Sequence, residues 1–461
     1  MKFNPEYQKS RKKLYEQVQK ELPEELKRLE WSREKILQNQ ESELRKLIKF
    51  AKEKSIWHAK NLKNFNADTI TLKDLTKIPP MSKTDIMDNW DDMITTDGIT
   101  KKIATDYLNK IRIDETINPY YEDKAMFFAT GGSSGERGIF VWEKKELPTF
   151  CKCVCRYEVK DELKRPISNK KVAILAAPML VHASTVLFST ISEKGTQQII
   201  CPTNLPIDEI CKQLNEFQPT HLNGFSSMIK ELSQCQLKGK LNIKPSRVVV
   251  SSEPLDEAGS ESIKKAWGID SHRMWGSVEI GVAGSGILNE NMYLLEDYNI
   301  LETVDENLQP TNDIKNIHKL LVTNFYNTAL PLIRYIIDDI LEIDEPKHGN
   351  GYRSIKSILG RDSNNFIYKN GKSINPLYVN DVISNYSDIE SYQVQQTETG
   401  MNVDIECSSE ETVKSLRNDL IGNIQNALGK DSTLTVKKVQ QIPRHPETGK
   451  IKYYVPLKKS T

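Results

Sequence analysis

The chain has 461 residues, of which 64 are Lys or Arg and 63 are Asp or Glu, so its formal net charge is +1. A chain of this length exceeds what one hydrophobic core usually serves, and we therefore expect at least two domains. A charge balance this close to zero provides no overall basic field, which excludes nucleic acid and an anionic membrane surface as general partners.

Residues 1–64 are expected to form a helical lead-in. Leu37, Leu44, Leu47, Ile48 and Ala51 recur at helical spacing, and Glu and Lys are interspersed on the opposite face. This mixture favours helices packed on the body over a nucleic-acid arm. The chain starts without an apolar signal-peptide core, and no run approaches the roughly 18 apolar residues of a membrane span. We expect a cytoplasmic protein that does not enter the membrane.

Residues 65–359 change to short apolar runs separated by turn residues and helical stretches. Examples are KVAILAAPM, QQIICP, SRVVVSSEP and HKLLVTNF. Runs of this length, bounded by Gly, Pro, Ser and Asn, are typical of strands buried on both faces. The fold class predicted is α/β, with a large N-terminal domain of layered sheets and helices. Function in such folds lies where the strands end.

Residues 360–461 are expected to form a separate, small α+β domain. MNVDIEC and STLTVKKV have the pattern of strands, and they flank the amphipathic helix EETVKSLRNDLIGNIQNAL. A unit of about 100 residues lies within the usual size range of a domain. We place the boundary near Gly360, Arg361 and Asp362.

The seven cysteines form no disulfide framework in so long a chain, and their odd number suits a reducing compartment. Cys151, Cys153 and Cys155 make a C-x-C-x-C cluster, but no second Cys/His pair follows at zinc-finger distance. Small buried thiols are the commoner explanation for such a cluster, and a metal site is the alternative.

The stretch TGGSSGERG, residues 130–138, combines four glycines with hydroxyl side chains. Glycine lets the backbone approach a ligand closely, while Thr130, Ser133 and Ser134 add hydroxyl donors, which suits phosphate binding. The stretch is neither a Walker A loop, which ends in G-K-[ST], nor the dinucleotide fingerprint G-x-G-x-x-G. A Gly/Ser loop alone is more often a plain turn, so its interpretation depends on other motifs.

Five further motifs follow the loop in order: SSEPL at 251–255, MWGSVEIG at 274–281, LPLIRYIIDDI at 330–340, GRD at 360–362 and PRHPETGK at 443–450. Together with the loop they resemble the adenylate-forming acyl/aryl ligase superfamily, in particular its phenylacetate–CoA ligase and CapK-like branch. Residues 39–61, 79–84 and 292–305 also resemble that branch, so the resemblance covers nearly the whole chain.

The resemblance implies a small, mobile C-terminal lid on the large domain, and a reaction in two steps. A carboxylate and ATP give acyl-AMP and pyrophosphate, and a nucleophile then takes the acyl group. The branch suggests a small, aryl acid as substrate and CoA as acceptor. An amine, a hydroxyl or a carrier-protein thiol is the alternative acceptor, and a non-catalytic nucleotide or acyl binder is the alternative function. A homodimer is common in the branch.

The resemblance also assigns the phosphate and metal sites. The β- and γ-phosphates of ATP would lie against the loop residues Thr130, Gly131, Gly132, Ser133, Ser134 and Gly135. Arg137 would replace a cation that the family carries as Lys. Glu279 falls on the family's Mg²⁺-binding glutamate, and a hard oxygen ligand suits this ion. A surface helix carboxylate is the alternative for Glu279.

The adenosine side is assigned to residues of three motifs. Ser252, Glu253 and Pro254 match a segment whose backbone reads the adenine. Trp275, followed by Gly276 and Ser277, stands where the family has an adenine-stacking tyrosine; a core anchor is the alternative. Asp339 would accept the ribose hydroxyls, although Asp338 leaves this register open. Arg334 and Arg361 would lie near the ribose and the domain junction, or form surface ion pairs.

Lys450 is the strongest catalytic candidate, beside Glu279 and Arg361. Its ammonium group on a long stem could reach both the carboxylate and the α-phosphate, whereas an exposed basic tail is the alternative. The acyl side is assigned to His182 and to Asn223, Gly224 and Phe225, for which ordinary packing is the alternative. The hinge residue is left open, because Ser363 stands where the family often has Asp or Lys.

Overall fold

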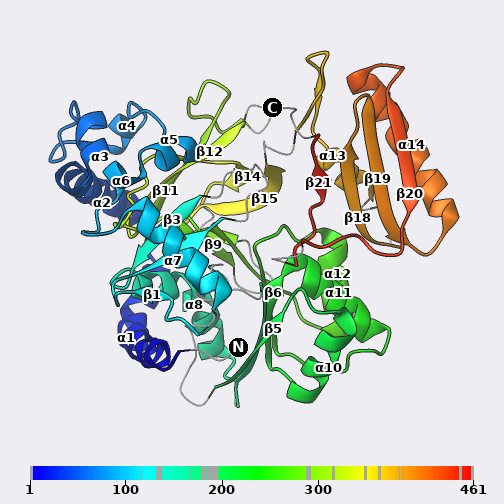
Figure 1. Cartoon of the computed structure of the whole chain (residues 1–461), viewed down its shortest axis with the longest axis horizontal. Helices are drawn as coiled ribbons and strands as arrows, with labels where there is room; N and C mark the ends of the chain where they lie inside the picture. Colours follow the sequence, from blue (N-terminus) through cyan, green and yellow to red (C-terminus); the bar gives the residue numbers. More distant parts are fainter. Residues whose placement is uncertain are drawn as a thin grey trace.

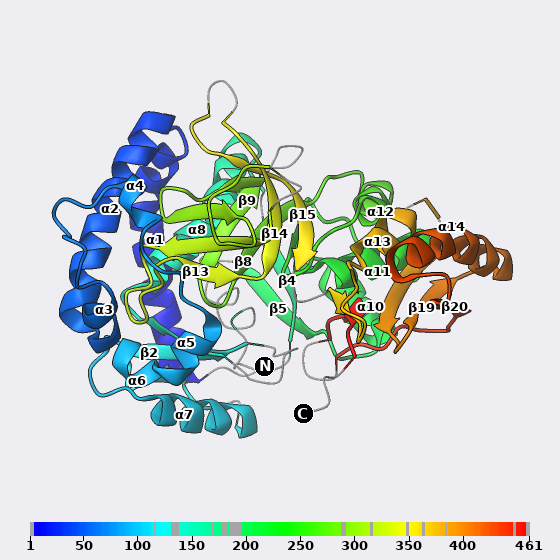
Figure 2. The same cartoon turned by 90° about the horizontal axis from the view of Figure 1, so that it is seen from above.

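The structure is a computed structural model that describes residues 4–457, apart from 115, 131–137, 168, 178–182, 184–195, 287–291, 314–316, 347–349, 362–364, 384, 387 and 446–448. Figures 1 and 2 show the N-terminal helices and the last sheet of the chain at opposite ends of the molecule, with the larger sheets between them. None of the described helices has the length and apolar character that a membrane crossing requires.

Polar side chains set the starts of the first helices. Asn4 accepts hydrogen bonds from the backbone N–H groups of Glu6 and Tyr7, and Ser32 accepts one from that of Lys35. These bonds satisfy groups that a helix start leaves without partners. The helices of this part are α1 (Pro5–Arg28), α2 (Arg33–Lys54), α3 (Ile56–Asn61), α4 (Leu72–Leu75), α5 (Lys83–Asp88), α6 (Trp90–Met93) and α7 (Lys101–Ile113).

Buried ion pairs fasten α1 and α2 to the body. The guanidinium of Arg156, on α8 (Leu147–Lys164), lies 2.7 Å from Glu25 of α1 and 2.7 Å from Asp297. Arg33 of α2 binds the buried Glu296 at 2.7 Å. Buried charges require such partners, so these helices are an integral part of the packing.

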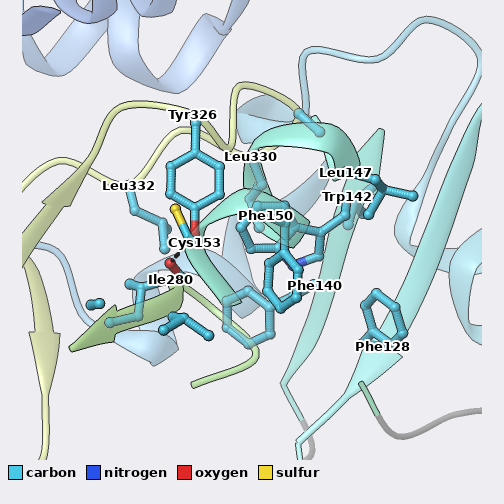
Figure 3. Close-up of a cluster of buried hydrophobic side chains, with 14 of the residues drawn as sticks. Phe128, Phe140, Trp142, Leu147, Phe150, Cys153, Ile280, Tyr326, Leu330 and Leu332 are labelled. Carbon is cyan, nitrogen blue, oxygen red and sulfur yellow. Dashed lines mark hydrogen bonds between the residues drawn. The ribbon is translucent and has the colours of Figure 1, made fainter. Parts of the chain in front are cut away.

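Helix α8 also carries the three clustered cysteines. Cys151 and Cys155 lie one turn apart on one side of the helix, whereas Cys153 points to another side. Figure 3 shows Cys153 beside Tyr326, whose hydroxyl donates to the Ile280 carbonyl at 3.1 Å. All three thiols are buried and none forms a disulfide, and burial raises the pKa of Cys153 and Cys155. Metal binding requires thiolates, so this packing favours core thiols over a metal site.

A hairpin flanks the glycine loop. Its strands β2 (Ala125–Ala129) and β3 (Ile139–Glu143) pair antiparallel, with Ala129 opposite Ile139, and β1 (Tyr120–Tyr121) pairs with β2. Every residue of β2 is buried, so packing fixes the base of the loop. A further antiparallel sheet consists of β11 (Asn299–Val304), β12 (Lys319–Asn324) and β13 (Tyr335–Ile337).

Nine strands form the largest sheet within the described residues. In spatial order they are β14 (Asp339–Asp344), β15 (Ser354–Arg361), β10 (Met292–Leu294), β9 (Gly281–Gly286), β8 (His272–Ser277), β7 (Arg247–Ser251), β6 (His221–Phe225), β4 (Lys171–Ala176) and β5 (Gln197–Pro202). The neighbours from β8 to β5 are parallel, and the others are antiparallel. The parallel strands therefore place their carboxyl ends along one edge.

Three helices pack on the parallel part of this sheet, between it and the last sheet of the chain (Figure 1). They are α10 (Ile207–Phe217), α11 (Ser226–Leu237) and α12 (Glu257–Trp267). Leu222 of β6 and Val248 of β7 share a buried cluster with Ile229 of α11 and Ile263 of α12. Burial of this apolar surface fixes α11 relative to the strand ends.

Residues 365–457, which we call the C-terminal unit, have a hydrophobic cluster of their own. Leu416, Leu420 and Ile424 recur at helical spacing on α14 and pack with Val394 and Val403 of its sheet. The elements of the unit are β16 (Phe366–Ile367), β17 (Ser373–Ile374), α13 (Leu377–Ile383), β18 (Ile389–Gln396), β19 (Gly400–Cys407), α14 (Glu410–Leu428), β20 (Thr433–Lys438) and β21 (Tyr454–Val455).

Candidate active site

Three segments that the sequence singled out lie side by side at the carboxyl edge of the large sheet. Phe225 at the end of β6 pairs with Ser251 at the end of β7, and Ser251 pairs with Met274 of β8. The segments 223–225, 252–254 and 275–277 are therefore neighbours in space. This edge is where α/β sheets bind ligands.

Polar atoms at this edge are buried without partners. Asn223 Oδ1, Ser227 Oγ, Glu253 Oε1 and Ser277 Oγ have no hydrogen-bond partner within the described part of the chain. Most buried polar atoms in proteins are hydrogen-bonded, so each exception calls for an explanation. A polar ligand at the strand ends is one explanation that accounts for all four.

A hydrogen bond joins the residues predicted for adenine and ribose. Trp275 Nε1 donates to Asp339 Oδ2 at 2.9 Å, and the Trp275 side chain is buried in the core. Asp339 begins β14, where its backbone lies opposite that of Arg361 in β15. Asp338 is exposed. The structure therefore brings Trp275, Asp339 and the backbone of Arg361 together, and it is Asp339 that bonds the indole.

Glu279 lies half-buried in the turn between β8 and β9. Trp142 of β3 donates from Nε1 to the Val278 carbonyl at 2.9 Å, which fastens this turn to the hairpin of the glycine loop. Burial, with the nearby charges of Glu279 and Asp338, raises the pKa of Tyr335. The ring of Tyr335 lies 6.4 Å from that of Phe140 in β3, so the charge of Glu279 acts close to the hairpin.

The glycine loop is closed at its base by two hydrogen bonds. The N–H of Thr130 donates to the Gly138 carbonyl, and the N–H of Gly138 donates to Thr130 Oγ1, each at 2.9 Å. Lys83 Nζ also donates to Thr130 Oγ1, at 3.2 Å. Lys83 therefore brings a cation to the loop, a role that the sequence analysis missed. The available signal was its place in PPMSKT, which served only for the resemblance.

Lys450 is carried onto the large body by a tight loop of the C-terminal unit. Its Nζ lies 4.7 Å from the centroid of the Phe225 ring, at the end of β6. Gly449 has φ +69°, and a Cβ there would lie 2.5 Å from the backbone oxygen of Thr203. A positive φ and this close approach both require glycine. Lys450 is therefore held at the strand ends and does not belong to an exposed tail.

Two residues predicted near the nucleotide have structural partners. Arg334 is buried, and it donates from Nε to Glu302 at 3.1 Å and from Nη1 to the Ile78 carbonyl at 2.6 Å. The buried pair with Glu302 corrects the prediction of a surface ion pair, and the contact with ribose stays a prediction. Glu253 accepts from the Ser227 N–H at 3.0 Å, which caps the start of α11.

Several predicted residues fall outside the described part of the chain, and their roles stay predictions. They are Gly131, Gly132, Ser133, Ser134, Gly135 and Arg137 of the loop, His182 on the acyl side and Ser363 near the hinge. For Arg361 the structure describes the backbone in β15.

Comparisons with known proteins support the resemblance. No family model matches the chain. It is 24% identical to Protein CapK of Staphylococcus aureus, over 76% of this chain and 73% of that protein. It is 21% identical to phenylacetate-coenzyme A ligase of Thermus thermophilus, over 93% of this chain and 98% of that protein. These relatives support the predicted superfamily and branch.

A solved structure of 2-hydroxyisobutyryl-CoA ligase, in its postadenylation state with 2-HIB-AMP, superposes with a TM-score of 0.68 at 16% identity. The match covers 91% of this chain and 88% of that one, which confirms the predicted fold class. The same ligase in its thioesterification state gives a TM-score of 0.54, at 16% identity over 92% and 89% of the two chains.

Proposed function

We propose that this chain, whose fold and relatives support membership of the adenylate-forming ligase superfamily, activates a small carboxylic acid with ATP and transfers the acyl group to CoA. One observation carries this proposal. A glycine-lysine loop of the C-terminal unit holds Lys450 over the carboxyl ends of the parallel strands, where four buried polar atoms have no partner among the described residues. A cation is what an attack on an α-phosphate requires at this place, because both reacting groups are negatively charged.

The residues at the strand ends fit ATP. In our proposal the phosphates lie against the glycine loop, where Thr130 and the Lys83 cation form the described base. The ribose hydroxyls donate to Asp339, whose carboxylate is oriented by the indole of Trp275. Glu279 would hold Mg²⁺ with its carboxylate, and the bound ion supplies positive charge to the phosphate oxygens.

In the first step an oxygen of the acid forms a bond to the α-phosphorus, and the bond from that phosphorus to the leaving pyrophosphate breaks. In our proposal the ammonium group of Lys450 contacts both the carboxylate and the α-phosphate in this step. In the second step the thiol sulfur bonds to the acyl carbon, the bond to AMP breaks, and the thiol proton passes to water. We propose that the C-terminal unit moves as a lid between these steps.

The acceptor and the surroundings are further parts of the proposal. A carrier-protein thiol, an amine or a hydroxyl would use the same first step, so each belongs in the test. None of the seven cysteines forms a disulfide, which suits a reducing compartment such as the cytoplasm. Aryl acids are our first choice of substrate, because of the branch that the relatives support.

The test is ATP–pyrophosphate exchange with Mg²⁺ across aryl, fatty and amino acids. We expect exchange with one acid class, and a loss of about a hundredfold or more in Lys450→Ala, because the variant removes the cation at the reacting atoms. The matched control is Lys452→Ala, which changes an exposed lysine two positions further along and should leave the rate unchanged.

Two results would contradict the proposal. If ATP binds but no acid supports exchange, the chain is a non-catalytic nucleotide binder. If Lys450→Ala exchanges as fast as Lys452→Ala, the docked lysine has no role in the chemistry. After exchange is found, CoA, amines and carrier proteins offered with the active acid would identify the acceptor.

A further inference from the structure

We propose that Arg444 is a positioning residue for Lys450, and that Glu231 on α11 is the anchor that holds Arg444 in the adenylating arrangement. We refer to the two side chains as the Arg444–Glu231 clasp. The inference rests on the proposed function and goes beyond it, because it assigns control of one half-reaction to a contact outside the reacting groups.

The loop that carries Lys450 is held together by its own hydrogen bonds. Arg444 and Ile451, on either side of Lys450, form an isolated antiparallel bridge. Within the loop, the His445 N–H donates to the Lys450 carbonyl and the Gly449 N–H donates to the His445 carbonyl, each at 2.8 Å. Arg444 Nη1 donates to the Gly449 carbonyl at 2.9 Å. The guanidinium therefore bonds the peptide group that leads directly into Lys450.

Glu231 anchors Arg444 to the large body. Arg444 Nη2 donates to Glu231, which lies in the middle of α11. The residue before this helix is Phe225, whose ring lies under the Lys450 ammonium group. The loop thus contacts the large body at two points, the carboxylate of Glu231 on α11 and the ring of Phe225 at the end of β6. The planar guanidinium of Arg444 bonds two acceptors in a fixed geometry. A lysine ammonium group in its place would fix the relative positions of the two acceptors less tightly.

Carboxyl groups from both bodies lie at this junction. The carboxyl group of Glu406 lies close by, and its pKa is raised by burial and then by the charges of Glu231 and Glu390, while Arg444 lowers it. Without Arg444, carboxylates from both sides of the junction would face each other with one cation fewer. Repulsion between them would disfavour the docked arrangement in particular, because separation of the two bodies relieves it.

Burial distinguishes the clasp from a second ion pair across the same junction. The side chains of Arg444 and Glu231 are 18% and 26% exposed, whereas those of Lys238 and Glu390 are 55% and 43% exposed. Exposed pairs contribute little, because water and salt screen them. Lys238 therefore provides a matched control for an interdomain ion pair that positions nothing.

The experiment uses the full chain and measures the two half-reactions separately. Pyrophosphate exchange reports adenylation, and consumption of chemically synthesised acyl-AMP with CoA reports thioester formation. We expect Arg444→Met and Glu231→Gln each to slow exchange by about tenfold or more. A tenfold loss corresponds to a docked state that is less stable by about 1.4 kcal/mol. Thioester formation should stay within about twofold of the wild-type rate, because that step does not use the docked lysine. Lys238→Met should leave both rates unchanged.

A merely structural role gives a different pattern. If Arg444→Met slows both half-reactions equally, or if Lys238→Met slows exchange as much, the clasp is overturned. The double variant should be no slower than the slower single variant, because the two residues act through one contact. Glu231→Gln keeps the size and shape of the side chain at a partly buried helix position, so it gives an answer even where Arg444→Met fails to fold. A wild-type chain without exchange overturns the proposed function and the clasp together, whereas active wild-type and active variants overturn the clasp alone.

Discussion

Replacement of Gly449 by alanine should separate docking of the lysine loop from folding of the chain. Gly449 has φ +69°, and the added Cβ would lie 2.5 Å from the backbone oxygen of Thr203. The Thr203 backbone cannot shift freely, because its N–H donates to the Ala176 carbonyl at 3.0 Å. The left-handed backbone costs a non-glycine residue about 1 kcal/mol, and overpacking adds about 1–3 kcal/mol.

The overpacking cost applies only while the C-terminal unit is docked, so it should appear in the rate of adenylation. At about 1.4 kcal/mol per factor of ten, we expect pyrophosphate exchange to fall between about fivefold and about a hundredfold. The control is Gly371→Ala in the same unit, where φ is +77° and no atom lies within 4 Å of the added Cβ. That variant carries the same backbone cost without the contact, so its exchange rate should equal that of the wild type.

Urea unfolding of both variants completes the test. Each should lose about 1 kcal/mol of stability in its C-terminal unit from the backbone alone. If Gly449→Ala exchanges pyrophosphate as fast as Gly371→Ala, the close approach to Thr203 does not govern adenylation, and the reasoning fails.

Three further perturbations test other parts of the structure. Asp339→Ala should raise the KM for ATP about tenfold or more, because it removes the carboxylate that the Trp275 indole orients. Asp338→Ala, at an exposed position, should leave this KM unchanged. Equal effects of the two variants would contradict the assignment of the ribose contact to Asp339. Arg156→Leu should lower the free energy of unfolding in urea by about 3–5 kcal/mol, since it removes the buried cation that bonds both Glu25 and Asp297 and leaves them only longer ion pairs. A loss under about 1 kcal/mol would refute this. Burial lowers the pKa of His58 to about 4. The unfolded chain therefore gains a proton below its pKa of about 6.5 that the folded chain does not, so stability should fall as the pH drops from about 7 to 5, by about 2 kcal/mol from this group. His58→Gln should reduce that pH dependence, and an unchanged slope would contradict the assignment.

The fold class could be predicted because its signals are local. KVAILAAPM and SRVVVSSEP are short apolar runs of the kind that parallel strands bury on both faces, and they form β4 and β7. Such runs predict strands in both domains, and the helical period of residues 410–428 predicts α14. The order of strands in the sheet is not local, and the sequence analysis did not address it.

The candidate site was only partly predictable for the same physical reason. Lys450 and Asp339 stand in recognisable motifs, but the partner of Asp339 is Trp275, and no local pattern announces a hydrogen bond between distant strands. Arg334 matched a motif, yet tertiary contacts with Glu302 and Ile78 turned its side chain into the core. Lys83 and the anchor Glu231 were missed because their significance depends on residues that the fold brings to them.

The buried ion pairs of α1 and α2 also determine how this chain can be divided. A fragment that starts at residue 65 would lose Glu25, the second carboxylate on Arg156, and Arg33, one of two cations on Glu296. It would also uncover the core surface that the side chains of α1 bury. Loss of these contacts, together with exposure of the apolar surface against which the helices pack, is destabilising, so such a fragment should aggregate when it is expressed alone. At the other end, the pairs that cross to the C-terminal unit are partly or largely exposed, and their loss is cheaper. Recombination could therefore exchange the C-terminal unit between relatives, while the N-terminal helices and the body must be inherited together.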